Sequence, residues 1–262
     1  NNHVRFEKQK EIKENFMSGH SHSANIAKKK EKIDAIKGKI FTKVGRELAV
    51  AAKNGSDPNT NSKLADAIAK AKACNMPNDN IKRCIAKAAG ELSATNFEEL
   101  TYEGYGPNGS AVIVKTLTDN KNRTFDYVRT AMRKHGGELG NSGCVSYNFQ
   151  TMGVIVIERT PDLDEDTVIE YALDAGADDV IAEEDAFTVY TSPSNFSAVR
   201  KYLEEKGLKF FSAEIDMIPQ NKVTLEGEAL EKFQRLIDGL EDLDDVQDVY
   251  HNVDLPDDED DE

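Results

Sequence analysis

The chain has 262 residues, of which 39% are hydrophobic, and its formal net charge is −15. This length favours two or three domains of about 70–100 residues over a single core, and the hydrophobic content excludes a wholly disordered chain. No apolar run in the sequence approaches the roughly 20 residues that cross a bilayer, and the three cysteines fit neither a disulfide framework nor a paired metal site. We therefore predict a cytoplasmic protein that needs no cofactor or metal.

The first third of the chain is predicted to be helical. Residues 1–17 are interpreted as a flexible leader or a cloning remnant, with Met17 as the biological start. Apolar residues three or four positions apart then predict helices at about residues 24–37, 40–52, 62–75 and 77–90, separated by Gly and Pro. Short helices with short loops favour a bundle, which we place at residues 18–98.

Strand patterns begin after Phe97. Residues 100–105 and 111–117 are predicted to form a hairpin closed by a type I turn at residues 106–109. A helix at 124–135 and a strand at 145–149 are expected to follow.

Residues 154–217 contain a complete β-α-β-β-α-β pattern, which is the ferredoxin-like split unit. The pieces on either side, residues 99–150 and 222–253, each have too little sheet to bury a helix. We expect them to form one discontinuous α/β domain with residues 151–221 inserted, followed by a disordered acidic tail at 254–262. The predicted fold class is thus α+β multidomain: an N-terminal helical bundle, then two ferredoxin-like α/β domains, one inserted into the other.

Charge is distributed unevenly along the chain. Residues 18–90 carry fifteen Lys or Arg and six Asp or Glu, whereas residues 226–262 carry two bases and sixteen acids. A basic module in an acidic protein indicates a phosphate binder that avoids spreading non-specifically over nucleic acid.

The candidate nucleic-acid contacts belong to three segments. In the polar segment before the first helix, the His20 imidazole and the Ser21 hydroxyl could donate hydrogen bonds. At the strand-to-helix junction near residue 120, Lys121 and Arg123 lie beside a helix N-terminus, which favours anions. The helical bundle adds the main cluster, in which Lys39 and Lys43 lie one helical turn apart. The full set is His20, Ser21, Lys28, Lys29, Lys30, Lys32, Lys37, Lys39, Lys43, Arg46, Lys121 and Arg123.

Two alternatives stay open for the bundle. Its main cluster could be a solvated surface that is paired with Glu31, Asp34 and Glu47. A further basic group could bind phosphate or only aid solubility; it comprises Lys70, Lys72, Lys82, Arg83 and Lys87.

No catalytic constellation is evident in the sequence. The Gly-rich loop at 104–109 lies between two strands and lacks the Lys-Ser/Thr of a phosphate loop. Cys144 has neither a neighbouring base nor an orienting acid, so we predict a protein that is not an enzyme.

Six motifs resemble those of the YebC/PmpR family. They are MSGHSHSANI at 17–26, GKIFTKVGREL at 38–48, NMPNDNI at 75–81, YEGYGPNGSA at 102–111, DNKNRT at 119–124 and GGELGNSGCVSYNF at 136–149. The resemblance extends to about residue 253 and implies a helical domain plus two α/β domains. Family members are described as DNA-binding transcriptional regulators or as ribosome-associated translation factors, including a mitochondrial translational activator.

The charge pattern and the resemblance together favour a non-enzymatic regulator, monomeric and not membrane-bound, that binds ribosomal or transfer RNA on the ribosome through its basic helical domain. DNA-binding transcriptional regulation is the first alternative. It ranks second because no helix gathers the Arg, Asn and Gln that read bases in duplex DNA. A small-molecule-sensing α/β regulator is the more distant alternative and rests on fold analogy alone.

Overall fold

The computed structural model describes residues 37–90, 96–183 and 185–255. Its N-terminal part contains α3 (Lys37–Ala52), α4 (Ser62–Ala73) and α5 (Asn78–Gly90). Their apolar faces meet in one core, in which Val44 and Leu48 of α3 contact the apolar side of α4 and α5. The three helices confirm the predicted bundle, while the helix expected at 24–37 lies almost entirely outside the described residues.

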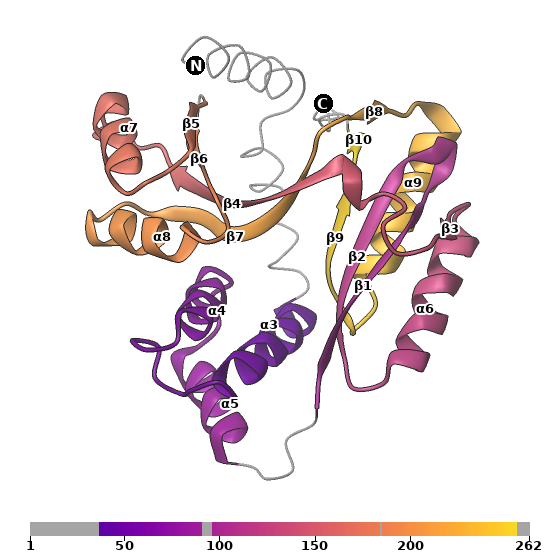
Figure 1. Ribbon diagram of the computed structural model, residues 1–262, viewed down its shortest axis with the longest axis horizontal. Coiled ribbons are helices and arrows are strands. Elements are labelled where there is room, and N and C mark those ends of the chain that lie inside the picture. The colour runs from indigo at the N-terminus through magenta and orange to yellow at the C-terminus, as the bar shows by residue number, and fades with distance from the viewer. Residues whose placement is uncertain (1–36, 91–95, 184, 256–262) are drawn as a thin grey trace.

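A four-stranded sheet with order β3-β1-β2-β9 forms the second unit. Val128 and Met132 of α6, together with Phe233 and Leu236 of α9, pack on one face of this sheet (Figure 1). Because β9 pairs antiparallel with β2, the sheet joins segments that are more than 120 residues apart. Its elements are β1 (Glu98–Tyr105), β2 (Ala111–Thr118), α6 (Lys121–Lys134), β3 (Glu138–Leu139), α9 (Gly227–Glu241) and β9 (Val246–His251).

The third unit is a four-stranded antiparallel sheet with order β5-β6-β4-β7, which is the ferredoxin-like order. Both of its helices pack on one face, around Ile155, Ile157 and Phe187. Its elements are β4 (Phe149–Glu158), α7 (Glu165–Asp174), β5 (Asp179–Ala182), β6 (Ala186–Thr191), α8 (Phe196–Glu205) and β7 (Phe210–Pro219). The predicted α+β fold class is confirmed. Two short strands, β8 (Val223–Thr224) and β10 (Val253–Asp254), pair in parallel next to the β3-β1-β2-β9 sheet, and Val253 belongs to the core of that unit (Figure 1).

The strand predicted at residues 145–149 is wrong. Ser146–Asn148 form a 3-10 turn, and β4 begins only at Phe149. The cause is Glu103 on β1, which is 7% exposed and whose carboxylate accepts backbone N–H bonds from Gly143, Val145 and Ser146 at 2.8, 3.0 and 2.9 Å. Backbone groups that bond a carboxylate are not free to join a sheet.

The turn between β1 and β2 also differs from the prediction. Pro107–Gly109 form a 3-10 turn in which Asn108 has a φ of 55°. A type I turn needs a negative φ at that position. Asparagine tolerates the left-handed conformation better than most residues, which permits this alternative.

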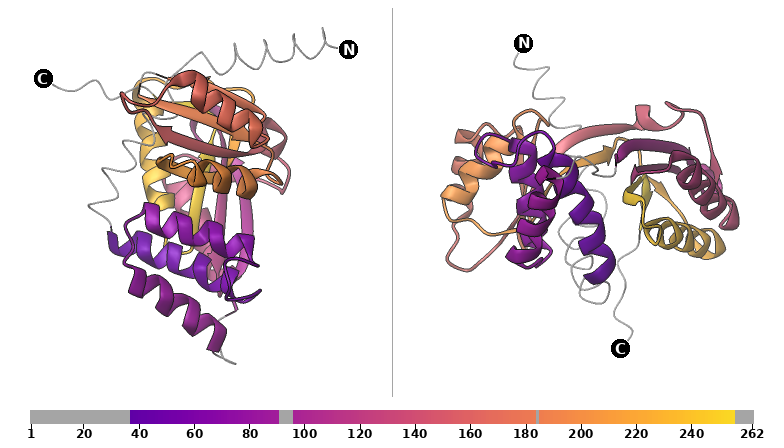
Figure 2. Two further views of the ribbon diagram at one scale, coloured as in Figure 1. Left: turned by 90° about the vertical axis from the view of Figure 1, so that its left-hand side faces the viewer. Right: turned by 90° about the horizontal axis from the view of Figure 1, so that it is seen from below.

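The helical bundle contacts both sheets (Figure 2): α4 packs on β7, and Arg46 of α3 donates to the Leu117 carbonyl of β2 at 3.3 Å. Asp66 of α4 accepts hydrogen bonds from Ser197 and Arg200 of α8 at 2.5 and 3.1 Å.

We propose that residues 151–221 are an inserted domain that folds without the remainder of the chain. Expressed alone, this piece should melt cooperatively, because the core around Ile155 and Phe187 lies wholly within it. Residues 99–150 should not fold alone, because β9 and the buried face of α9 are missing. Thermal melting followed by circular dichroism tests both pieces, and a cooperative transition for residues 99–150 would refute the boundary.

Candidate nucleic-acid interface

The predicted site residues fall into two groups in the structure. His20, Ser21, Lys28, Lys29, Lys30 and Lys32 lie outside the described residues, and Lys37 opens α3. Of the others, Lys39, Lys43 and Arg46 on α3 and Arg123 at the start of α6 meet at the junction between the helical bundle and the discontinuous sheet, whereas Lys121 does not.

Three cations of α3 contact the end of α9 and the loop that leads from it to β9. Lys39 Nζ lies 3.0 Å from Asp242 Oδ1, and Lys43 Nζ donates to the Glu241 carbonyl at 2.8 Å. Arg46 Nη1 donates to the Asp244 carbonyl at 2.8 Å. These groups therefore attach the bundle to an acidic loop about 200 residues away.

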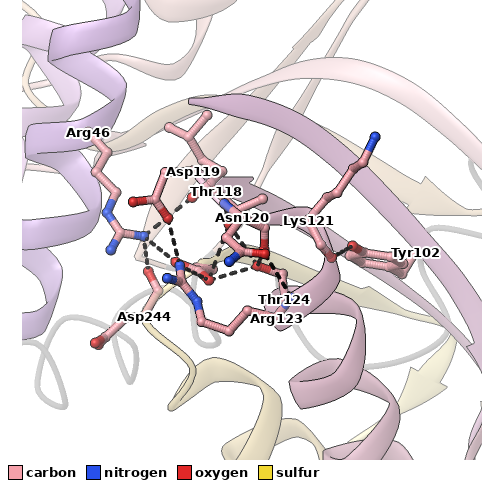
Figure 3. A network of polar contacts seen from close by, with 11 residues as sticks. Arg46, Tyr102, Thr118, Asp119, Asn120, Lys121, Arg123, Thr124 and Asp244 are labelled. Atoms are coloured by element: carbon pink, nitrogen blue, oxygen red, sulfur yellow. Dashed lines mark hydrogen bonds and ion pairs between the residues drawn. The ribbon is translucent and has the colours of Figure 1, made fainter. Parts of the chain in front are cut away.

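Asp245 is the centre of this junction, and Figure 3 labels its partners, among them Arg46, Arg123 and Thr124. Its side chain is 8% exposed, and its carboxylate lies 2.9 Å from Arg46 Nη1 and 2.8 Å from Arg123 Nη2. Thr124 donates to the same carboxylate at 2.7 Å and Thr118 at 3.3 Å. Burial would raise the pKa of Asp245, but the hydrogen bonds from Arg123, Thr124 and Arg46 outweigh it, and the pKa is lowered.

The start of α6 positions Arg123 for this contact. Asn120 caps the helix, because its side chain accepts the backbone N–H of Arg123 at 3.1 Å. Arg123 also pairs with Asp119 at 2.8 Å. Lys121 is exposed, and its side chain points away from the network in Figure 3. Lys121 and Arg123, which were predicted to act together, therefore differ: Arg123 is paired within the junction, and Lys121 points to solvent.

A cavity of about 580 Å³ lies between α3, the start of α6 and the α9–β9 loop. Three cations line it, together with four carboxylates, those of Asp119, Asp242, Asp244 and Asp245. A lining in which carboxylates outnumber cations disfavours an anion, so the cavity is not a phosphate pocket in this arrangement.

Lys70 is likewise used within the molecule. Its Nζ lies 3.0 Å from Glu47 and 3.8 Å from Asp248 of β9. Burial alone would lower the pKa of Lys70, but these two carboxylates raise it, so the ammonium stays charged. Other cations of the second basic group remain exposed on α4 and α5; they are Lys72, Lys82, Arg83 and Lys87.

Sequence analysis missed a third group of cations, which lies along the whole of α6 beyond Arg123. The signal was present as five Lys or Arg within fourteen residues, but only the first two of these were assigned to a site. Within the described residues no cluster of three or more potential metal ligands occurs. None of the described helices is long and apolar enough to cross a membrane.

The chain is similar to known proteins over most of its length. The family model of the TACO1/YebC protein N-terminal domain matches residues 21–91. The family model of the TACO1/YebC second and third domain matches residues 97–253. A Clostridium tetani protein is 56% identical over 241 residues, which are 92% of this chain and 98% of the relative. A Thermoanaerobacter pseudethanolicus protein is 53% identical over 245 residues, which are 93% of this chain and 100% of the relative.

Both relatives bear the name "Probable transcriptional regulatory protein". Among solved structures, a conserved hypothetical protein from Aquifex aeolicus is similar, with a TM-score of 0.75 and 43% identity. The match covers 86% of this chain and 93% of that one. The similarity thus extends over nearly the whole chain in both sequence and fold.

Proposed function

Because this chain belongs to the TACO1/YebC family, we propose that it is a non-enzymatic regulator of gene expression that binds RNA on the ribosome. The regulatory part of this proposal follows the names of its relatives. The choice of RNA rests on the chain's own charge distribution.

One observation carries the proposal: a bundle region with nine surplus positive charges belongs to a chain of net charge −15. Exposed cations, Lys82, Arg83 and Lys87 among them, lie on α5. Such a surface attracts phosphates at short range, while the acidic remainder repels nucleic acid elsewhere. A partner with a fixed shape, such as folded ribosomal or transfer RNA, suits this distribution better than an arbitrary duplex.

Sedimentation of a cell lysate through a sucrose gradient tests this function. We expect the full chain to co-migrate with ribosomal particles at low salt and to leave them at high salt, because phosphate contacts weaken as salt rises. Migration only at the top of the gradient at low salt would contradict the proposal.

DNA binding is the second candidate, since the relatives' names point to transcription. Its test is retention on a promoter duplex at physiological salt. Tight, sequence-dependent retention of this kind, with no ribosomal co-migration, would favour the transcriptional role over the ribosomal one.

The α3 cations allow a sharper test within the bundle. Lys39 Nζ donates to the Asp242 carboxylate and Lys43 Nζ to the Glu241 carbonyl, and the negative charge of this acidic segment repels a phosphate that approaches the same nitrogens. We propose that RNA competes with the loop for them. Lys39→Glu with Lys43→Glu should then weaken RNA binding and reduce the salt slope of log K by about 0.7 per lost contact.

Fluorescence anisotropy at several salt concentrations measures the slope, and thermal melting of the same variant reports on the junction. The matched control is Lys201→Glu with Lys209→Glu, which changes net charge equally at exposed positions outside the bundle. A lower melting temperature with an unchanged slope would assign the α3 cations to domain docking alone.

A further inference from the structure

The outward side of α6 carries a concentrated positive charge. The helix contains five cations and one acid, Asp126, in a chain that is acidic overall. Thr124, Val128 and Met132 face the core. The solvent-facing residues, by contrast, include Lys121, Arg129, Arg133 and Lys134.

An aromatic ring interrupts these cations on the same side. Lys121, Phe125, Arg129 and Arg133 follow one another at one-turn intervals. Phe125 is 41% exposed, and its ring lies 5.6 Å from the Arg129 guanidinium and 6.1 Å from the ring of Tyr102. Tyr102 contacts the ring from one side, and Phe125 still presents an apolar surface to solvent.

The neighbouring acids neutralise this surface only in part. Arg129 lies 3.9 Å from Asp126, and Arg133 lies 4.0 Å from Glu138. All four side chains are at least 45% exposed, so both pairs are weak. Within the described residues no ion pair involves the ammonium of Lys121 or Lys134, which leaves α6 with surplus positive charge.

We infer that the outward side of α6 is a second RNA contact, at which an unpaired base stacks on Phe125 while Arg129 and Arg133 bind the adjacent phosphates. This inference rests on the proposed function and adds the form of RNA that is bound. Stacking on an aromatic side chain needs a free base face, which single-stranded RNA offers and a paired duplex conceals. The cations of α6 attract the negatively charged phosphate backbone of the RNA.

The experiment measures binding of the full chain to a fluorescent, unstructured single-stranded RNA by anisotropy. Arg129→Glu with Arg133→Glu should reduce the salt slope by about 1.4. Phe125→Leu should weaken binding about 5-fold with the slope unchanged, because it removes a stacking surface but no charge. Lys201→Glu with Lys209→Glu serves as the charge-matched control, and thermal melting checks that every variant is folded.

The outcomes separate this inference from the proposed function. If the wild type binds RNA and the α6 variants bind as the control does, the α6 contact is refuted and the function stands. If the wild type does not bind this single-stranded RNA, the α6 contact is refuted, and the sucrose gradient alone decides whether the proposed function stands. Equal weakening by the control would show a non-specific charge effect and would also refute the contact. A single-stranded DNA of the same sequence that binds more tightly than the RNA would overturn the choice of RNA.

Discussion

Replacing Asp245 by Asn should lower the free energy of unfolding by about 3 kcal/mol, because it removes the shared counter-charge of two arginines at a nearly buried position. Arg46 and Arg123 both bond this carboxylate, and two threonine hydroxyls donate to it. An amide keeps the shape, yet its nitrogen cannot accept these bonds. A fall of about 8 °C in the melting temperature is the corresponding observable.

The control for this variant lies in the same loop. Asp242→Asn removes the same charge at a position where the side chain is 71% exposed and pairs with Lys39, so it should change stability by less than about 0.5 kcal/mol. Equal melting temperatures for the two variants would show that the Asp245 network does not hold the junction together.

The difference in stability between the wild type and Asp245→Asn should depend on pH, because the pKa of Asp245 is lowered in the folded protein. A carboxyl whose pKa is depressed in the folded state contributes its full stability above its ordinary value of 3.8 and loses it as the pH falls through the folded value. The gap in melting temperature between wild type and Asp245→Asn should be constant from about pH 5 upward and should shrink below about pH 4. Melting curves across this range measure it.

Glu103→Gln should lower the free energy of unfolding by about 2–3 kcal/mol. An amide accepts fewer of the three backbone hydrogen bonds, and its own N–H groups would face the backbone N–H donors. The loss is local, since all three donors lie in residues 143–146. Hydrogen exchange of the amides of Gly143, Val145 and Ser146 should accelerate more than exchange elsewhere in the sheet.

Glu138→Gln provides the comparison, because that carboxylate is 78% exposed on the neighbouring strand. If the amides of residues 143–146 are as well protected from exchange in Glu103→Gln as in the wild type, the Glu103 carboxylate does not determine this turn.

The ferredoxin-like unit was predictable from sequence because its signals are local. Alternating apolar residues mark strands, and Gly or Pro marks the ends of helices. Thus β7 was expected at 209–217 and lies at Phe210–Pro219. The two boundaries of β7 shift by one and two residues, because they depend on pairing with β4, which sequence periodicity does not contain. The start of β4 shifts further, from residue 154 to Phe149.

The roles of individual charges were not predictable in the same way. Glu103 looks like an ordinary strand residue, and its three backbone partners lie about 40 residues away. Lys39 and Arg46 were expected to contact phosphate or nearby acids of the bundle, whereas they contact a loop about 200 residues away. Local sequence reports the charge of a helix but not which remote element docks on it.

The salt dependence of RNA binding by the intact chain tests the central claim most directly. Anisotropy of a labelled single-stranded RNA should show log K falling linearly with log salt between about 50 and 200 mM, with a slope of about −2 or steeper for three or more phosphate contacts. A duplex DNA of the same sequence should bind more weakly. No measurable RNA binding at the lowest salt, or an affinity that does not change with salt, would contradict the account.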